Sequence, residues 1–378
     1  MATICLLCEY PTLCGGERSM LSTLDAVRAA GFRMMAAAPP AGSLADALAE
    51  NGIEQIPFSV FEPGGERRTQ AAIRGDLDHL LRRCRPDVLH ANSLAMGRLS
   101  GPVAAEAGVP SIAHLRDIVR LSRQAIEDLN RHHRLLAVSH AVRRYYLAAG
   151  LEDGKTRVIY NGVDLARFQP RPPTGYLHRE LGLPPDARLV GTIGQICLRK
   201  GQDVLIQAAT ALADRVPDAH YLIVGQRNSQ KQESVDFEAR LHCAARQGPL
   251  AGRLHLVGER DDIHGLLNEL VLLVHPARQE PLGRVLLEAA ASGVAVVATA
   301  VGGTDEIFPP HSHSARLVAH DSASALAEAM AGLLDDDHAR LTLGQAARAR
   351  AESAFGLDPA GTALAAEYAA VAGIRRHG

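Results

Sequence analysis

A regular alternation of short apolar runs with longer amphipathic stretches, repeated twice along the chain, is the feature that most constrains the fold. In the first half, apolar runs such as residues 2–8 (ATICLLC) and 135–139 (LLAVS) are predicted strands, and stretches such as 69–84 are predicted helices. Strands that alternate with helices indicate βαβ units and a parallel sheet. The pattern stops at residues 168–173, where three prolines fall within four residues, and restarts with a predicted strand at 187–194 (ARLVGTIG).

The break predicts two domains. A chain of 378 residues is long enough for two hydrophobic cores, and a proline-rich segment suits an extended linker. We therefore predict an α/β protein with two doubly wound, Rossmann-like domains, at residues 1–168 and 174–357, that face each other across a cleft. Ligands of such sheets bind at the carboxyl ends of the strands, so the cleft is the predicted place for a functional site.

The composition excludes several classes of protein. A formal net charge of -2 argues against nucleic-acid binding, and the absence of tryptophan removes a common platform for stacking on bases or sugars. No run of 18 apolar residues is present, so no membrane span is predicted, and residues 1–11 are predicted to form a strand instead of a signal peptide. Cys5 and Cys8 are spaced like a metal pair, but strand geometry puts their side chains on opposite faces. Reduced cysteines in the cytoplasm are therefore expected, with no metal site.

The segment 275–303 holds the most informative pattern of polar residues. It is predicted to run from a strand end through a loop into a helix, with Glu280 in the loop, Gly283 at the helix start and Glu288 within the helix. A glycine at a helix start leaves backbone N–H groups open to an anion. Carboxylates in these two places suit sugar hydroxyls and a ribose diol. The other reading is that Glu280 caps the helix and Glu288 is a solvated helix residue.

The whole string HPA-x2-EPLG-x4-E-A-x2-SG-x-AVVAT-x2-GG-x2-E resembles the donor motif of the retaining GT-B glycosyltransferases in glycosyltransferase family 4. Glu280, Gly283 and Glu288 match that motif, and Leu282 stands where the family usually has Phe. The resemblance implies that Glu280 orients the transferred sugar and that Glu288 binds the ribose. It also implies that Leu282, Gly283 and Arg284 contact the donor, and that the fold is GT-B. It extends over nearly the whole chain.

Residues 190–208 (VGTIGQICLRKGQDVLIQA) carry a second match. The family has an Arg and a Lys-Gly pair in this segment, which hold the donor diphosphate, and Lys200 and Gly201 match the pair. Gln195 stands where the Arg usually is, so one positive charge is missing, and Arg199 is the neighbouring cation that could replace it. The other reading of Arg199 and Lys200 is an exposed basic turn.

Three shorter matches complete the predicted site. In CGGERSML, Gly15 and Gly16 precede a predicted helix, where a glycine-rich turn lets backbone N–H groups approach phosphate or sugar. The string LVGERDDI resembles the family's base-binding loop, with backbone groups near Glu259 and Arg260 as the contacts. The string IAHLRD puts His114 at a strand end, where related enzymes often carry a His near the reacting sugar. A structural histidine is the alternative.

The resemblance implies a retaining glycosyltransferase that moves a sugar from a UDP- or GDP-sugar to a glycan, a lipid-linked glycan or another hydroxyl acceptor. It implies His114, Lys200 and Glu280 as catalytic residues. Fixed positive charge would stabilise the departing diphosphate without a metal ion or a cofactor. Two alternatives stay open: a sugar-nucleotide epimerase of the same two-domain shape, and a non-catalytic protein that binds nucleotide sugars.

Two further segments carry less specific predictions. Residues 114–145 contain seven arginines. A solvated helix face is the favoured reading, and the alternative is an acceptor surface or a weak peripheral contact with the inner face of a membrane. The resemblance also implies that the last helix, at about 359–378, packs back on the first domain.

Overall fold

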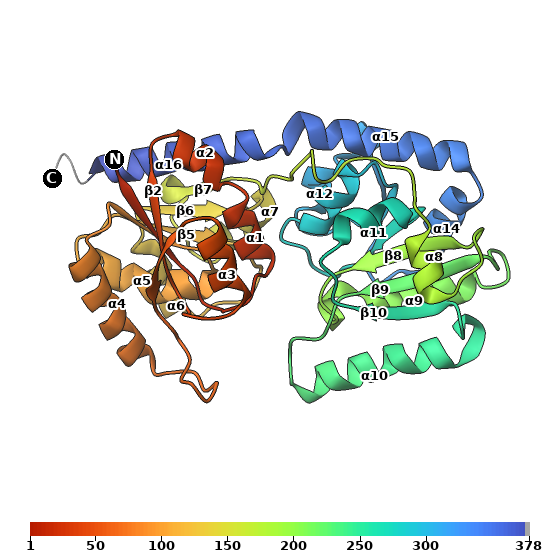
Figure 1. Ribbon diagram of the computed structural model, residues 1–378, viewed down its shortest axis with the longest axis horizontal. Coiled ribbons are helices and arrows are strands. Elements are labelled where there is room, and N and C mark those ends of the chain that lie inside the picture. The colour runs from red at the N-terminus through yellow and green to blue at the C-terminus, as the bar shows by residue number, and fades with distance from the viewer. Residues whose placement is uncertain (375–378) are drawn as a thin grey trace. The chain divides into compact units, whose positions relative to one another are not determined.

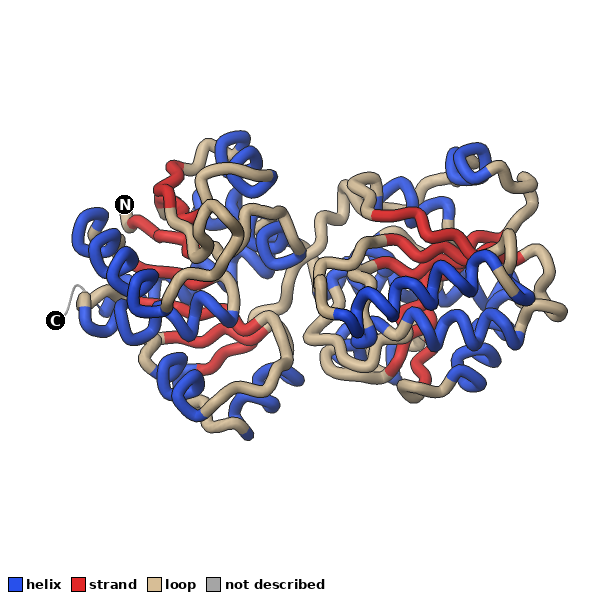
Figure 2. The backbone as a smooth tube through the Cα atoms, turned by 90° about the horizontal axis from the view of Figure 1, so that it is seen from below, coloured by secondary structure: helices blue, strands red, loops and turns tan. Residues whose placement is uncertain are grey.

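The computed structural model describes residues 1–374, and the chain divides into two compact units. The first unit holds Met1–Gly162 and the segment that begins at Leu357, and the second unit holds Val163–Gly356. Each unit is a parallel sheet with helices on its faces (Figure 2). Within the described part of the chain, no helix combines the length and the apolar character that crossing a bilayer requires.

The predicted linker at residues 168–173 belongs to the second unit, because the division follows Gly162. Two contacts fix this segment to that unit. Phe168 is buried, and the backbone N–H of Arg171 donates to Asn268 Oδ1 at 2.7 Å. Residues 169–175 form neither helix nor strand. They lie within the second unit, which begins at Val163.

The sheet of the first unit has seven parallel strands in the order β3-β2-β1-β4-β5-β6-β7. The central strands are almost wholly buried and apolar, as expected of a parallel sheet that helices cover on both faces. The strand order reverses between β1 and β4, and this reversal is the topological switch point at which ligands of such sheets bind. The strands are β1 Thr3–Leu7, β2 Arg33–Ala38, β3 Glu54–Pro57, β4 Val88–Ala91, β5 Ser111–Leu115, β6 Arg134–Ala137 and β7 Thr156–Val158.

The last helix, α16, packs on α2 of the first unit (Figure 1). Gly361 permits this approach, because a Cβ there would lie 2.4 Å from the Cβ of Ala26. Residues 375–378 of the predicted helix lie outside the described residues. The helices are α1 Gly15–Leu21, α2 Leu24–Ala29, α3 Ser43–Glu50, α4 Gln70–Cys84, α5 Leu94–Glu106, α6 Arg123–Asn130, α7 His140–Ala148 and α16 Leu357–Ile374.

The sheet of the second unit has six parallel strands in the order β10-β9-β8-β11-β12-β13, so its switch point lies between β8 and β11. Its strands are β8 Arg188–Ile193, β9 Ala219–Val224, β10 Leu254–Gly258, β11 Leu272–His275, β12 Val296–Thr299 and β13 Arg316–Val318. Its helices are α8 Tyr176–Leu181, α9 Gln202–Ala211, α10 Gln232–Arg246, α11 Ile263–Glu269, α12 Arg284–Ala291, α13 Thr304–Ile307, α14 Ala323–Leu334 and α15 Asp337–Ala354. Both units are thus doubly wound, as the sequence predicts.

Candidate functional site

Two loops meet at the switch point of the second sheet. The loop after β8 carries Lys200 on a 3-10 turn, and the loop after β11 carries Glu280. Lys200 Nζ lies 2.6 Å from Glu280 Oε2, and His275 Nε2, at the end of β11, lies 2.8 Å from the same oxygen. The structure therefore brings together two of the predicted catalytic residues and adds His275, which sequence reasoning missed. The sequence feature that could have identified His275 is its place at a strand end, in the string HPA.

Glu280 is an ionised acceptor in this cluster. Its side chain is buried, and burial alone would raise its pKa, but the charge of Lys200 and the hydrogen bond with His275 outweigh burial and lower the pKa of Glu280 below its usual range. Burial, followed by the charge of Lys200, lowers the pKa of His275, so its ring is neutral. An ionised carboxylate can only accept. His275 therefore donates through Nε2–H, and Glu280 keeps Oε1 for a ligand.

Close backbone packing and an ion pair hold these two loops together. Gly201 has a φ of 68°, and a Cβ on it would sit 2.0 Å from the carbonyl oxygen of Pro276. The Arg278 guanidinium donates to the two carboxylate oxygens of Asp203 at 2.9 and 2.8 Å. Lys200 is therefore held in place by the contacts of its neighbours as well as by its own pair with Glu280.

Gly201→Ala is expected to lower the free energy of unfolding of the second unit by about 1–3 kcal/mol, because the added Cβ meets a backbone carbonyl at positive φ. Urea unfolding measures the change. Gly332→Ala is the matched control. It lies in α14 with no neighbouring atom within 4 Å of an added Cβ, so its stability should stay the same or rise by up to about 1 kcal/mol. Equal stability of the two variants would contradict the close approach at Gly201.

The start of α12 gathers four of the predicted donor residues. Gly283 is the N-cap, with a φ of 105°. Arg284 Nη2 lies 2.8 Å from Glu288 Oε1, so the predicted ribose ligand has a cation beside it. Glu288 is 7% exposed. Leu282 as a whole is 1% exposed and belongs to the core. Contact of Leu282 with a donor stays a prediction.

Two neighbouring glycines after β12, Gly302 and Gly303, support the backbone of Glu280. Gly302 has a φ of 59°, and a Cβ on it would lie 1.8 Å from the Glu280 carbonyl oxygen. The backbone N–H of Gly303 donates to the same carbonyl at 2.9 Å. The turn after β12 thus fixes the loop that carries Glu280. These glycines lie in the GG-x2-E part of the motif, but the sequence alone does not connect them with Glu280.

Gln195 and Arg199 lie in the loop after β8. The carbonyl of Gln195 accepts a hydrogen bond from Gln202 Nε2 at 2.9 Å, at the start of α9. Arg199 Nη1 donates to the carbonyl of Gln279 at 3.2 Å. The Arg199 guanidinium is thus anchored on the neighbouring loop, and its other N–H groups have no hydrogen-bond partner among residues 1–374. That Arg199 replaces the missing Arg stays a prediction.

Glu259 and Arg260 follow β10 and have partners within the second unit. Glu259 accepts from the side-chain amide of Gln226. Arg260 is held on two sides: Nε and Nη2 donate to the Asp262 carboxylate at 2.8 Å each, and Nη1 donates to Glu180 Oε1 at 2.5 Å. The Arg260 side chain thus fastens this loop to α8. Contact with a nucleotide base through the backbone here stays a prediction.

The carboxyl edge of the first sheet places His114 at the end of β5. His114 is 4% exposed, and its ring stacks on His90 with 5.5 Å between centroids and 19° between planes. His90 Nδ1 lies 2.6 Å from the hydroxyl of Tyr368 in α16. Burial, followed by the charge of Arg116, lowers the pKa of His90 to about 3 and that of His114 well below 6.5. Both rings are therefore neutral near pH 7.

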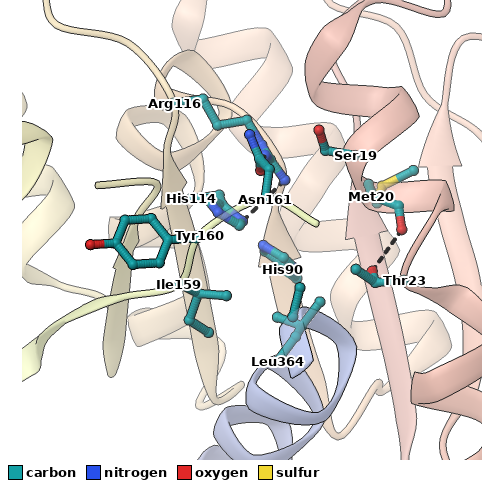
Figure 3. Close-up of a pocket in the computed structure, with 11 residues that line it drawn as sticks. Ser19, Met20, Thr23, His90, His114, Arg116, Ile159, Tyr160, Asn161 and Leu364 are labelled. Atoms are coloured by element: carbon teal, nitrogen blue, oxygen red, sulfur yellow. Dashed lines mark hydrogen bonds between the residues drawn. The ribbon is translucent and has the colours of Figure 1, made fainter. Parts of the chain in front are cut away.

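A small cavity of about 20 Å³ lies beside these histidines, with room for about one water molecule (Figure 3). The predicted glycine-rich turn opens α1 next to it. Gly15 has open space around it, whereas a Cβ on Gly16 would lie 3.2 Å from Arg116 Cδ. Residues of the first and last helices and of strand ends surround the cavity: Ser19, Met20, Thr23, His90, His114, Arg116, Ile159, Tyr160, Asn161, Ala360 and Leu364.

Arg116 is a second residue that sequence reasoning missed as part of the site. Its guanidinium contacts His114 and the side chains of Asn92 and Asn161. The signal was available in the string IAHLRD, where an arginine follows His114 by two residues at a strand end.

Cys5 and Cys8 are buried free thiols of the first unit. Within residues 1–374, no group of three or more His, Cys, Asp or Glu side chains is placed to hold a metal ion.

Two family models match this chain, one in each unit. The model for Glycosyltransferase Family 4 matches residues 14–167. The model described as Glycosyl transferases group 1 matches residues 176–350, which include the loops that carry Lys200 and Glu280. Together the two models account for most of the chain.

Curated relatives agree with these matches. The lipopolysaccharide core biosynthesis mannosyltransferase LpsB of Rhizobium meliloti is 32% identical over 217 residues, which are 57% of this chain and 61% of that protein. The D-inositol 3-phosphate glycosyltransferase of Xylanimonas cellulosilytica is 31% identical over 73% of this chain and 62% of its own length. The match thus spans less than two thirds of either relative. The phosphatidyl-myo-inositol mannosyltransferase of Mycolicibacterium smegmatis is 29% identical over 91% of this chain and 87% of its own.

Solved structures share the fold. Anabaena HepE, in complex with UDP and glucose, superposes with a TM-score of 0.86 and 24% identity over 98% of this chain and 100% of that one. The sucrose-phosphate synthase of Thermosynechococcus elongatus superposes with a TM-score of 0.81 and 20% identity over 99% and 100% of the two chains. The two-domain GT-B fold that the sequence predicts is confirmed.

Proposed function

Because this chain belongs to glycosyltransferase family 4, the group 1 glycosyltransferases, we propose that it transfers a sugar from a nucleoside diphosphate sugar to a hydroxyl acceptor with retention at the anomeric carbon. One observation carries the proposal. Lys200, Glu280 and His275 form a buried cluster at the switch point of the second sheet, beside the glycine-led start of α12. A fixed cation and helix N–H groups at this edge suit a diphosphate.

The proposed chemistry is stabilisation of the leaving group. As the bond from the anomeric carbon to the diphosphate breaks, negative charge grows on the diphosphate oxygens, and the Lys200 ammonium opposes it. Glu280 presents Oε1 to a hydroxyl of the sugar while Lys200 and His275 hold Oε2. His114 of the first unit donates a hydrogen bond to the sugar. The acceptor hydroxyl attacks from the side of the departing diphosphate and passes its proton to a diphosphate oxygen as the donor bond breaks, so no enzyme nucleophile is assigned.

The names of relatives support a proposal for the donor and acceptor classes. A neighbour in fold was crystallised with UDP-glucose, and relatives in sequence are named as mannosyltransferases of lipopolysaccharide core and of phosphatidyl-myo-inositol. We propose a UDP- or GDP-sugar as donor and a glycan or lipid-linked glycan as acceptor, reached in the cytoplasm or at the inner face of the membrane. Since Lys200 supplies positive charge, we propose that turnover needs neither a metal ion nor a cofactor.

A donor panel tests the proposal. The purified chain is mixed with UDP- and GDP-sugars, with and without EDTA, and products are followed by chromatography. Slow release of UDP or GDP and free sugar, unaffected by EDTA and with the anomer retained, is the expected result. Conversion of the donor into an isomer would instead identify a sugar-nucleotide epimerase. Binding without turnover of any donor, even with mixed glycan acceptors, would identify a non-catalytic binding protein.

Glu288→Ala is expected to weaken donor binding by about 1.5–3 kcal/mol, the usual worth of hydrogen bonds to a charged group. The reason is that Glu288 lies in the first turns of α12, mostly buried, where its carboxylate suits a ribose diol. Calorimetric titration with UDP or GDP measures the change. Glu233→Ala, at an exposed carboxylate of α10, is the control and should bind as the parent does. Unchanged affinity in Glu288→Ala would remove the ribose assignment.

A further inference from the structure

Arg116 is a partly buried cation that has no role in the proposed chemistry. It follows β5, two residues after His114. Nε donates to the Asn92 carbonyl at 3.1 Å, Nη2 to Asn92 Oδ1 at 3.1 Å, and Nη1 to Asn161 Oδ1 at 3.0 Å. Nη2 also lies 3.2 Å from His114 Nδ1. Figure 3 shows Arg116, Asn161 and His114 grouped at one side of the cavity.

The contact with His114 fixes where the imidazole carries its proton. A guanidinium has only donors, so Nδ1 of His114 must accept. A neutral ring that accepts at Nδ1 carries its hydrogen on Nε2. His114 Nε2 is buried, and among residues 1–374 it has no hydrogen-bond partner. The ring therefore holds one unused N–H donor next to the cavity.

The surroundings keep this ring neutral. Burial is the main cause that lowers the pKa of His114, followed by the positive charge of Arg116 and the neighbouring His90 ring. Glu17 of α1 faces the group through Asn92, whose Nδ2 donates to Glu17 Oε1 at 3.3 Å. The hydroxyl of Tyr368 in α16 lies beside His90 Nδ1 and is hydrogen-bonded there. Since no carboxylate of the described chain bonds to the His114 ring, nothing there favours an imidazolium.

Most of the donor groups of Arg116 are taken by neighbouring residues of the first unit. Four of its five N–H groups have acceptors: Asn92 takes two, and Asn161 and His114 take one each. Its side chain also passes over Gly16, where a Cβ would lie 3.2 Å from Arg116 Cδ. A lysine offers one compact ammonium and cannot reproduce this fork. These hydrogen bonds therefore make Arg116 a partner that holds neighbouring side chains in place.

We propose that Arg116 is a positioning residue that holds His114 in the Nε2–H tautomer and so presents a fixed, uncharged donor to a hydroxyl of the transferred sugar. The role of His114 toward sugar rests on the proposed function, whereas the tautomer is a property of the protein alone. A neutral donor also suits this reaction, because an imidazolium would oppose the positive charge that grows on the sugar ring as the diphosphate leaves.

Long-range 1H–15N spectra of 15N-histidine-labelled protein test the tautomer directly. With 17 histidines in the chain, the His114 signals are assigned by their loss in His114→Gln. In the parent near pH 7, His114 is expected to be neutral and protonated at Nε2 alone. Protonation at Nδ1 in the parent would overturn the proposal, and so would an imidazolium.

Arg116→Met and Arg116→Lys separate the hydrogen bond from the charge. In Arg116→Met, His114 is expected to become a tautomer mixture with a higher pKa, and kcat should fall roughly 10- to 100-fold with a new loss of activity toward acid pH. In Arg116→Lys, the pKa should stay low while the tautomer is released. Arg83→Met, at an exposed arginine of α4, is the control and should match the parent.

The two readouts keep this inference distinct from the proposed function. If the His114 tautomer shifts in Arg116→Met but the parent has no transferase activity, Arg116 still positions His114 and the transferase assignment is wrong. A transferase whose His114 tautomer and pH profile do not change in either Arg116 variant would remove the positioning role alone. If Arg116→Met does not fold, the parent spectrum and Arg116→Lys still decide the question.

Discussion

Lys200→Met is expected to lower kcat by roughly 10²–10³-fold, about 3–4 kcal/mol in barrier, as the loss of one preorganised electrostatic group does elsewhere. The cause is the removal of the ammonium that faces the proposed diphosphate, at the end of the loop after β8. Donor hydrolysis at saturating donor measures kcat. Lys231→Met, at an exposed lysine before α10, is the control and should keep the parent activity. Activity of Lys200→Met within about twofold of the parent would remove Lys200 from the mechanism.

The same substitution is expected to lower the free energy of unfolding of the second unit by about 3–5 kcal/mol, because it leaves the buried Glu280 carboxylate without its cation. Lys200→Met/Glu280→Gln separates this loss from the loss of turnover. A neutral amide needs no counter-ion and still accepts from His275, so stability should largely return while kcat stays low. Recovery of both in the double variant would mean that Lys200 acts only as a structural partner of Glu280.

The sheet strands are largely predictable from the sequence, and the helix α5 is not. Strands of a parallel sheet that is covered on both faces are near-continuous apolar runs, and the run at residues 2–8 yields β1 for this reason. Leu94–Glu106 is buried almost all round, so it lacks the amphipathic period that marks a helix. Its glycines allow this burial, because a Cβ on Gly101 would lie 2.0 Å from the Asp128 carbonyl oxygen. Such contacts belong to the tertiary structure and leave no local signal.

The candidate site is likewise only partly predictable from the sequence. Motifs place Lys200 and Glu280 each in a loop at a strand end, and the structure pairs them because both loops leave the switch point of one sheet. The sequence holds no sign of that pairing, since the two residues lie far apart in the chain. For Arg116, the position is visible in the sequence, but the function is not. Its place beside His114 is local, but its effect on that ring depends on Asn92 and Asn161, which arrive from other parts of the sheet edge.

Lowering the pH from near 7.5 to near 5 is expected to reduce the free energy of unfolding of the first unit by about 4 kcal/mol or more. Burial lowers the pKa of His90 to about 3 and that of His132 to about 4, from 6.5. Near pH 5 both rings stay neutral in the folded unit, whereas both are protonated in the unfolded chain. The unfolded state then binds more protons, so stability falls as the pH falls below 6.5. Each ring contributes about 2 kcal/mol over about 1.5 pH units.

Urea unfolding at both pH values, with hydrogen exchange to identify the first unit, measures this loss. His90→Gln should remove about 2 kcal/mol of the pH dependence, whereas His79→Gln, at an exposed ring of α4, should remove none. His114 acts in the same direction as His90, since burial lowers its pKa as well. Glu17 opposes them, because burial raises its pKa and the folded unit takes up that proton first. Because three histidines lower the free energy of unfolding at acid pH and one carboxyl raises it, a net decrease is expected. Stability that did not change with pH would mean that these rings are charged in the folded unit, and His114 would then not be the neutral donor that Arg116 is proposed to fix.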